Sequence, residues 1–124
     1  MPWGDGSKTP AVLIVEDEPL VRLRAMQTIE DAGFEVIEAA DADEAIRILE
    51  SRRNIRVIFT DIRMPGSMDG LKLAHAVRNR WPPIKIIVTS GDREFSADDL
   101  PEGGRFIAKP YDPKQVTDAI RAWI

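Results

Sequence analysis

Short apolar segments alternate with segments of helical periodicity along the chain. The apolar segments have strand length and cover residues 11–15, 34–39, 55–60, 84–88 and 106–108. Helical spacing of apolar residues begins at or just after Pro19, Asp41, Leu71, Arg93 and Asp112. The first helix counts Leu20 and Leu23 among its apolar positions, and Gly33 is expected to follow its end as a cap.

This alternation predicts an α/β fold. Each crossover helix returns the chain to the same end of the sheet, so the five strands are expected to be parallel and covered by helices on both faces. A length of 124 residues supports one domain. We assign that domain to residues 11–124 and a short flexible lead-in to residues 1–10.

Polar residues follow several of the predicted strands. Glu16 and Asp17 come after the first strand, Asp61 after the third, Thr89 with Ser90 after the fourth, and Lys109 after the fifth. Ligands of such sheets bind beyond the carboxyl ends of the strands. Converging carboxylates repel one another unless a cation intervenes, and Mg²⁺ suits an oxygen-rich site of this kind. A lysine and a hydroxyl add what a phosphoryl group requires, which suggests aspartyl phosphate chemistry.

Composition narrows the possible partners. Seventeen basic residues stand against 21 acidic ones, a net charge of −4, so binding along a nucleic-acid backbone is not expected. Cysteine is absent, which excludes a disulfide scaffold, a thiolate zinc site and a cysteine nucleophile, and is compatible with a reducing cytosol. The longest apolar run, at residues 11–15, is far shorter than the roughly 20 residues that span a bilayer. No signal peptide is apparent, so we expect a cytoplasmic protein with no membrane partner.

Four motifs in order together resemble the response-regulator receiver family. They are VEDEP at residues 15–19, DIRMPG at 61–66, VTSG at 88–91 and FIAKP at 106–110. The resemblance runs over residues 11–124. It implies a flavodoxin-like, doubly wound parallel sheet with strand order 2-1-3-4-5.

The resemblance also implies an acceptor and a metal site. Asp61 matches the aspartate that takes a phosphoryl group from a sensor kinase's phosphohistidine. Asp17 matches the carboxylate that binds Mg²⁺ directly together with Asp61, while Glu16 would hold the metal mainly through water. The backbone carbonyl of Arg63 would supply a further ligand.

Three more roles follow from the same resemblance. Lys109 and Thr89 would contact phosphoryl oxygens, and Phe106 would be the aromatic whose rotamer follows Thr89. Arg63 and Gly91 flank the site two residues after Asp61 and Thr89. Because Arg63 would shield the phosphoryl group and Gly91 has no side chain to orient water, we expect slow loss of the phosphoryl group.

The leading interpretation is a stand-alone phosphoacceptor switch rather than a turnover enzyme. Its phosphodonor would be a sensor histidine kinase or a histidine phosphotransfer protein, and its output would be binding to a downstream protein that the sequence does not identify. One alternative is the receiver portion of a longer DNA-binding response regulator. The other is a magnesium-dependent phosphohydrolase of the haloacid dehalogenase type, which requires a second aspartate where this chain has Arg63.

Overall fold

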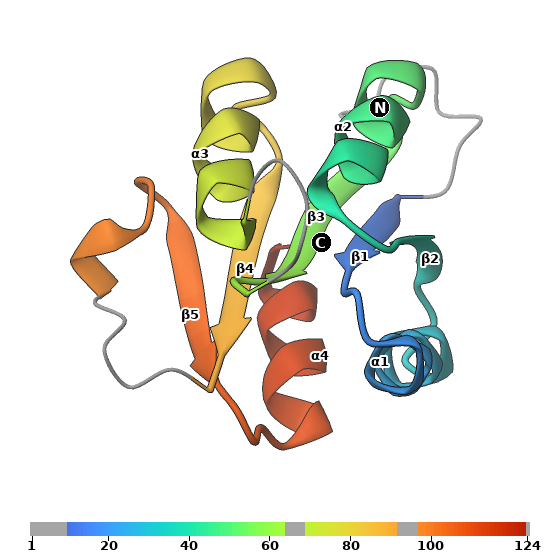
Figure 1. Ribbon diagram of the computed structural model, residues 1–124. Helices are drawn as coiled ribbons and strands as arrows, with labels where there is room; N and C mark the ends of the chain where they lie inside the picture. Colours follow the sequence, from blue (N-terminus) through green and yellow to red (C-terminus); the bar gives the residue numbers. More distant parts are fainter. Residues whose placement is uncertain (1–9, 64–68, 92–96, 124) are drawn as a thin grey trace.

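The computed structural model describes residues 10–63, 69–91 and 97–123. These form a five-stranded parallel sheet in the order β2-β1-β3-β4-β5, which confirms the predicted doubly wound fold (Figure 1). The strands are β1 (Ala11–Val15), β2 (Glu35–Ala39), β3 (Ile55–Asp61), β4 (Lys85–Ser90) and β5 (Gly104–Ala108). The helices are α1 (Pro19–Asp31), α2 (Ala42–Ser51), α3 (Gly70–Arg80), α4 (Pro113–Trp123) and the short 3₁₀ helix η1 (Ala97–Asp99).

The sheet lies between two pairs of helices. Helices α2 and α3 cover one face, and α1 and α4 cover the other (Figure 1). Side chains alternate along each strand. Leu13 of β1 therefore packs in the apolar core beneath α2 and α3, and Val12 packs in the core beneath α1 and α4. Two cores therefore hold β1 and β3 at the centre, and the loops that follow these strands rest on a rigid base.

Local hydrogen bonds and turns set several helix boundaries, of which those at Asp41 and Gly33 were predicted. The Asp41 carboxylate accepts a hydrogen bond from the Glu44 backbone N–H (2.8 Å), while the Glu44 carboxylate accepts one from the Ala40 N–H (2.7 Å). Asp69 caps α3 in the same manner by accepting from the Lys72 N–H (2.9 Å). Gly33 follows α1 with φ at 99°, a conformation that glycine adopts at little cost.

Two strands extend further at their carboxyl ends than the sequence predicted. Asp61 is the last residue of β3, and β4 continues through Thr89 and Ser90. The ladder persists because Asp61 is in register with Thr89, and the Ile62 N–H donates to the Thr89 carbonyl (3.1 Å). These polar residues therefore have strand geometry, which fixes the direction of their side chains.

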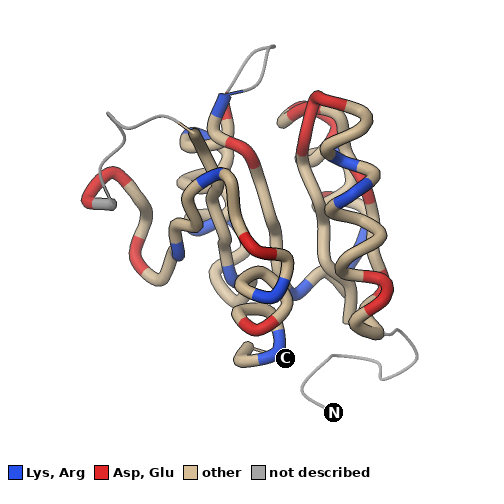
Figure 2. The backbone as a smooth tube through the Cα atoms, turned by 90° about the horizontal axis from the view of Figure 1, so that it is seen from below, with Lys and Arg blue, Asp and Glu red and all other residues tan. Residues whose placement is uncertain are grey.

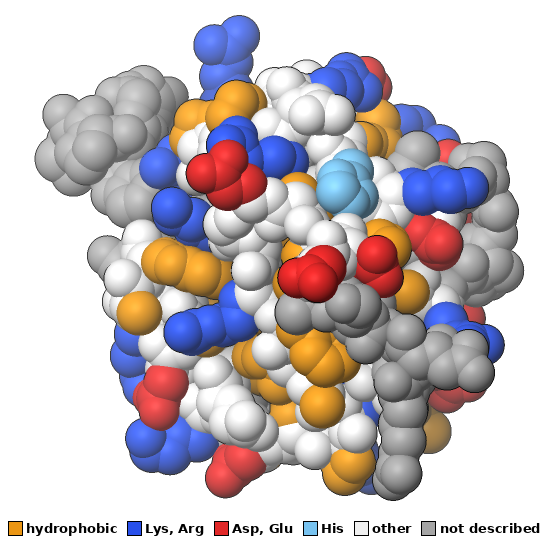
Figure 3. Space-filling view, turned by 90° about the vertical axis from the view of Figure 1, so that its left-hand side faces the viewer, with side chains coloured by type: hydrophobic (Ala, Val, Ile, Leu, Met, Phe, Trp, Pro, Cys, Tyr) orange, Lys and Arg blue, Asp and Glu red, His pale blue; other side chains and the backbone are white. Residues whose placement is uncertain are grey.

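In the described part of residues 93–100, the structure differs from the predicted helix. Residues 92–96 lie outside the described residues, and residues 97–99 form only the 3₁₀ turn η1. A tight turn follows it, in which the Gly104 N–H donates to the Pro101 carbonyl (3.0 Å). The ring of His75, the only histidine and the pale blue side chain in Figure 3, hydrogen-bonds the Asp99 carbonyl (2.8 Å) and ties η1 to α3.

Helix α1 buries fewer of its apolar residues than its spacing predicted. Ala25 and Ile29 are buried, whereas Leu20 and Leu23 are 72% and 47% exposed. The first turn of α1 therefore presents apolar surface close to the acidic loop that precedes it. Helical spacing predicted the helix but not which of its apolar residues are covered, because it does not show how far the neighbouring layer reaches.

Charged residues are distributed over every element of the fold except β1. Figure 2 shows acidic and basic positions interspersed along the backbone, with no continuous basic stripe in that view. Within the described ranges, no helix is both long and apolar enough to cross a membrane.

Candidate functional site

An acidic cluster forms where β1 and β3 end. The carboxylates of Glu16, Asp17 and Asp61 offer oxygens that all lie within 4.8 Å of one another. Register explains this convergence, since Val15 pairs with Thr60 and the next residue of each strand meets at the same edge. Glu16 and Asp61 are only 5% and 9% exposed, so water screens their mutual repulsion poorly.

Lys109, which directly follows β5, supplies the compensating positive charge. Its Nζ atom lies 2.8 Å from Asp61 Oδ2 and 3.4 Å from Glu16 Oε1. Burial disfavours the ammonium ion, but the hydrogen bond and the charge of Asp61 outweigh it and raise the pKa of Lys109. The other Asp61 oxygen, Oδ1, accepts the Arg63 backbone N–H at 3.3 Å.

Glu16 is the residue of the cluster whose charged form is disfavoured by its surroundings. Burial raises its pKa from 4.5 to about 7, and the negative charge of Asp61 adds to this rise. The backbone N–H of Glu18 (3.1 Å to Oε2) and the Lys109 ammonium act in the opposite direction. The metal-free site therefore holds a carboxylate that is partly protonated near neutral pH.

The raised pKa of Glu16 predicts a pH-dependent stability for the metal-free protein. The pKa of Glu16 is about 7 in the folded protein and 4.5 in the unfolded chain, so protonation of Glu16 favours the folded state. This contribution to stability is fully present below pH 4.5 and is lost as the pH rises to about 7. Glu16→Gln stays neutral and keeps an acceptor for the Glu18 N–H, so it should become more stable than the wild type by about 1–3 kcal/mol over that interval. Urea unfolding in EDTA at several pH values measures the difference. A constant difference at every pH would contradict this account of Glu16.

Thr89 supplies an unused hydroxyl. It pairs with Asp61 in the register of β3 and β4, so both side chains point to the same face of the sheet. Thr89 is 3% exposed, and its Oγ1 atom has no hydrogen-bond partner among the described residues. A buried hydroxyl without a partner costs free energy, which an anionic oxygen placed beside Asp61 would recover.

Three other residues were predicted to act at this site. Phe106 is half-buried and pairs with Val88, one position before Thr89, so its side chain points to the opposite face of the sheet. Arg63 is exposed, and a methyl group at Gly91 would lie 4.0 Å from Lys109 Cβ, in ordinary contact. The roles assigned to these residues stay predictions.

Two residues that the sequence analysis did not assign prove important to the geometry. A Cβ atom at Gly70 would overlap the Asp61 carbonyl oxygen, so only glycine fits where α3 begins. The Arg22 guanidinium donates to the carbonyl of Glu16 (2.8 Å), immediately before Asp17. The pair Asp69–Gly70 at a helix start was a signal for the first, whereas nothing in the pattern identified Arg22.

The cluster has the donor set of a divalent cation site. Carboxylate oxygens from Glu16, Asp17 and Asp61 match the oxygen ligands that Mg²⁺ prefers, and two or three of them leave room for water and phosphoryl oxygens. The buried carboxylates also gain from a cation, because their mutual repulsion is relieved.

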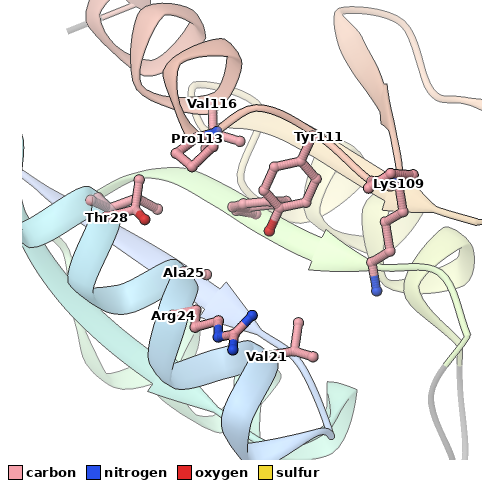
Figure 4. Close-up of a pocket in the computed structure, with 11 residues that line it drawn as sticks. Val21, Arg24, Ala25, Thr28, Lys109, Tyr111, Pro113 and Val116 are labelled. Atoms are coloured by element: carbon pink, nitrogen blue, oxygen red, sulfur yellow. The ribbon is translucent and has the colours of Figure 1, made fainter.

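A groove adjoins the cluster on the α1 and α4 side. Its volume is about 470 Å³, and Figure 4 shows Val21, Ala25 and Thr28 of α1 facing Tyr111 and Val116 across it. Lys109 lies at one end of the groove, with its ammonium pointing toward the acidic cluster. A largely apolar surface groove therefore shares Lys109 with the charged site.

The fold and this site define a doubly wound α/β protein with an acidic, lysine-containing centre at the carboxyl end of the sheet. The chain belongs to the response regulator receiver domain family, which matches residues 12–121.

Comparison with known proteins agrees with this assignment. The sensor kinase CckA of Brucella abortus is 35% identical over 94% of this chain, and the hydrogenase transcriptional regulatory protein HoxA of Cupriavidus necator is 38% identical over 92% of it. The chain spans 13% and 24% of these two proteins. The crystal structure of a response regulator receiver protein from Sinorhizobium medicae superposes with a TM-score of 0.86 at 27% identity, and 94% of each chain is covered.

Proposed function

We propose that this chain is a phosphoacceptor switch that takes a phosphoryl group on Asp61. One observation carries the proposal: a buried carboxylate lies 2.8 Å from a lysine and is paired, on the neighbouring strand and the same face of the sheet, with a buried hydroxyl that has no partner among the described residues. The cation and the hydroxyl suit the oxygens of a group attached to Asp61.

The proposed reaction is an in-line transfer. An oxygen of Asp61 attacks the phosphorus of a phosphohistidine, an O–P bond forms as the N–P bond breaks, and the electron pair of that bond goes to the imidazole nitrogen. Lys109 then shifts from the carboxylate to a phosphoryl oxygen, and the Thr89 hydroxyl donates to another.

Mg²⁺ fits this site, and we propose Glu16, Asp17, Asp61 and the backbone carbonyl of Arg63 as the groups that hold it. The ion would neutralise charge that develops on the transferring phosphoryl group. The chain's own contribution is to fix Asp61 between the Arg63 N–H and Lys109 before the donor arrives.

The proposed donor is a sensor histidine kinase or a histidine phosphotransfer protein, acting in the cytoplasm. The groove beside Lys109 and the exposed Leu20 and Leu23 give α1 an apolar docking surface next to the acceptor. After phosphorylation the chain would signal by binding a downstream protein. It accepts and loses the group itself and is not a turnover enzyme.

Two related functions remain as alternatives to a stand-alone switch. The relatives CckA and HoxA carry the matching segment within longer proteins, so the same site would equally serve as the receiver portion of a longer regulator. A phosphohydrolase of the haloacid dehalogenase type is disfavoured, because an exposed arginine occupies the position of its second aspartate.

The direct test uses a small phosphodonor such as acetyl phosphate. Incubation with Mg²⁺ should add one acid-labile phosphoryl group, measured by intact-protein mass spectrometry, and EDTA should suppress it by about tenfold or more. Absence of labelling over hours at millimolar donor and Mg²⁺ would contradict the proposed function.

The lifetime of the phosphorylated state gives a second test. We propose slow decay, because Arg63 would guard the phosphoryl group while Gly91 has no side chain to orient water. Arg63→Asn and Gly91→Glu should each speed dephosphorylation by about threefold or more at constant Mg²⁺. The larger residue fits at position 91, where the nearest atom to a new Cβ is 4.0 Å away. Unchanged decay in both variants would show that these side chains do not set the lifetime.

A further inference from the structure

Arg22 connects three parts of the fold at the edge of the acidic cluster. Its Nη1 atom donates to the Glu16 carbonyl at 2.8 Å, and its Nε atom donates to the Glu38 carboxylate at 3.1 Å. Its own backbone N–H donates to the Glu18 carbonyl at 2.8 Å, as the first hydrogen bond of α1. The side chain is only 17% exposed, whereas that of Glu38 is 50% exposed.

These contacts restrain the peptide that precedes Asp17. The Glu16 carbonyl belongs to the same planar unit as the Asp17 N–H, so a hydrogen bond to that oxygen fixes how the Asp17 backbone is oriented. The Glu16 N–H donates in turn to the Ala39 carbonyl (3.1 Å), at the end of β2. Arg22 and the end of β2 therefore restrain both backbone polar groups of Glu16.

We infer that Arg22 is a positioning residue for the cation site, an inference that rests on the proposed function. The guanidinium holds the Glu16–Asp17 peptide so that both carboxylates point toward Asp61. Glu38 contributes by orienting the guanidinium, much as outer residues orient metal ligands in other sites.

An effect of Arg22 through its charge and an effect through positioning would change the Mg²⁺ affinity in opposite directions when Arg22 is replaced. Arg22 is a cation near the proposed Mg²⁺ site, so an effect through charge alone would make its removal tighten Mg²⁺ binding. A positioning role makes its removal weaken binding, because the acidic loop loses its restraint. The sign of the change thus separates the two explanations.

The experiment measures Mg²⁺ affinity by following amide chemical shifts during a titration at constant ionic strength. Arg22→Gln and Arg22→Lys should each raise the Mg²⁺ dissociation constant by about 3- to 10-fold. Lysine keeps the charge but lacks the fork that reaches both Glu16 and Glu38. Arg47→Gln, which removes the same charge from an exposed site on α2, is the matched control and should change the constant by less than about 1.5-fold.

A second readout needs no metal. In EDTA, the Glu18 amide, which donates to the Glu16 side chain, should exchange its hydrogen faster in both Arg22 variants than in the wild type. In a double-mutant cycle, Glu38→Gln should have less effect on Mg²⁺ affinity when Arg22 is already glutamine.

Equal or tighter Mg²⁺ binding by Arg22→Lys and Arg22→Gln, with unchanged Glu18 exchange, would overturn the inference. A wild type that shows no Mg²⁺-dependent shifts would instead contradict the proposed function, and the metal-free exchange rates would still decide whether Arg22 restrains the loop. If glutamine prevents folding, the lysine variant decides both measurements.

Discussion

Asp61→Asn should abolish phosphoryl labelling by a small phosphodonor, with a loss of at least about 100-fold. Asparagine has nearly the same shape as aspartate, so the packing at the end of β3 is preserved. It lacks the anionic oxygen that attacks phosphorus, and Lys109 loses the partner that now lies 2.8 Å away. Intact-protein mass spectrometry after incubation with acetyl phosphate and Mg²⁺ measures the result.

The matched control for this variant is Asp118→Asn. Asp118 is an exposed aspartate on α4 that pairs with Lys114 (2.7 Å), so the substitution makes the same chemical change away from the site. It should be labelled at the rate of the wild type. Labelling of the Asp61→Asn protein at an undiminished level would place the acceptor on another residue.

Gly70→Ala should destabilise the protein by about 2–4 kcal/mol and slow its phosphorylation. The added Cβ would overlap the Asp61 carbonyl oxygen and lie 2.9 Å from the Ile62 Cα, both backbone atoms that no side-chain rotation moves. The start of α3 must shift away, which disturbs the hydrogen bond from the Gly70 N–H to the Ile62 carbonyl (2.7 Å). Urea unfolding measures the stability.

Gly91→Ala provides the comparison for Gly70→Ala. Position 91 lies at the same edge of the sheet, but a Cβ there is 4.0 Å from its nearest neighbour. The expected change in the free energy of unfolding is within about 0.5 kcal/mol. Equal stability of the two variants would show that α3 moves without cost and that the close approach to Asp61 is unimportant.

The sequence predicted the strands and most helices because their signals are local. A five-residue apolar run such as Ala11–Val15, followed at once by an acidic turn, favours a buried strand by its length. The pair Asp41 and Glu44 defines a helix start through its own hydrogen bonds. The parallel topology then places Glu16, Asp61 and Lys109 at one edge. The ion pair of Lys109 with Asp61 is thus a consequence of strand order together with residue type.

The remaining features depend on distances between elements that no local pattern contains. Gly70 is required because α3 approaches the backbone of Asp61, and the reach of Arg22 to Glu38 spans α1 and β2. The exposure of Leu20 could not be predicted for the same reason, since burial depends on what packs above a helix face. The described part of residues 93–100 is a 3₁₀ turn because Pro101 and the glycines after it favour a tight turn over a longer helix.

The ion pairs of Lys109 join residues that are 93 and 48 positions apart in the chain. The lysine follows β5, which enters the sheet only beside a completed β4, so the charged centre exists only after the last strand has docked. A nascent or truncated chain that contains Asp61 but lacks β5 has the carboxylate without its ammonium partner. Formation of the charged centre is therefore coupled to complete folding, and ligands that occupy the finished site should in turn favour the folded state.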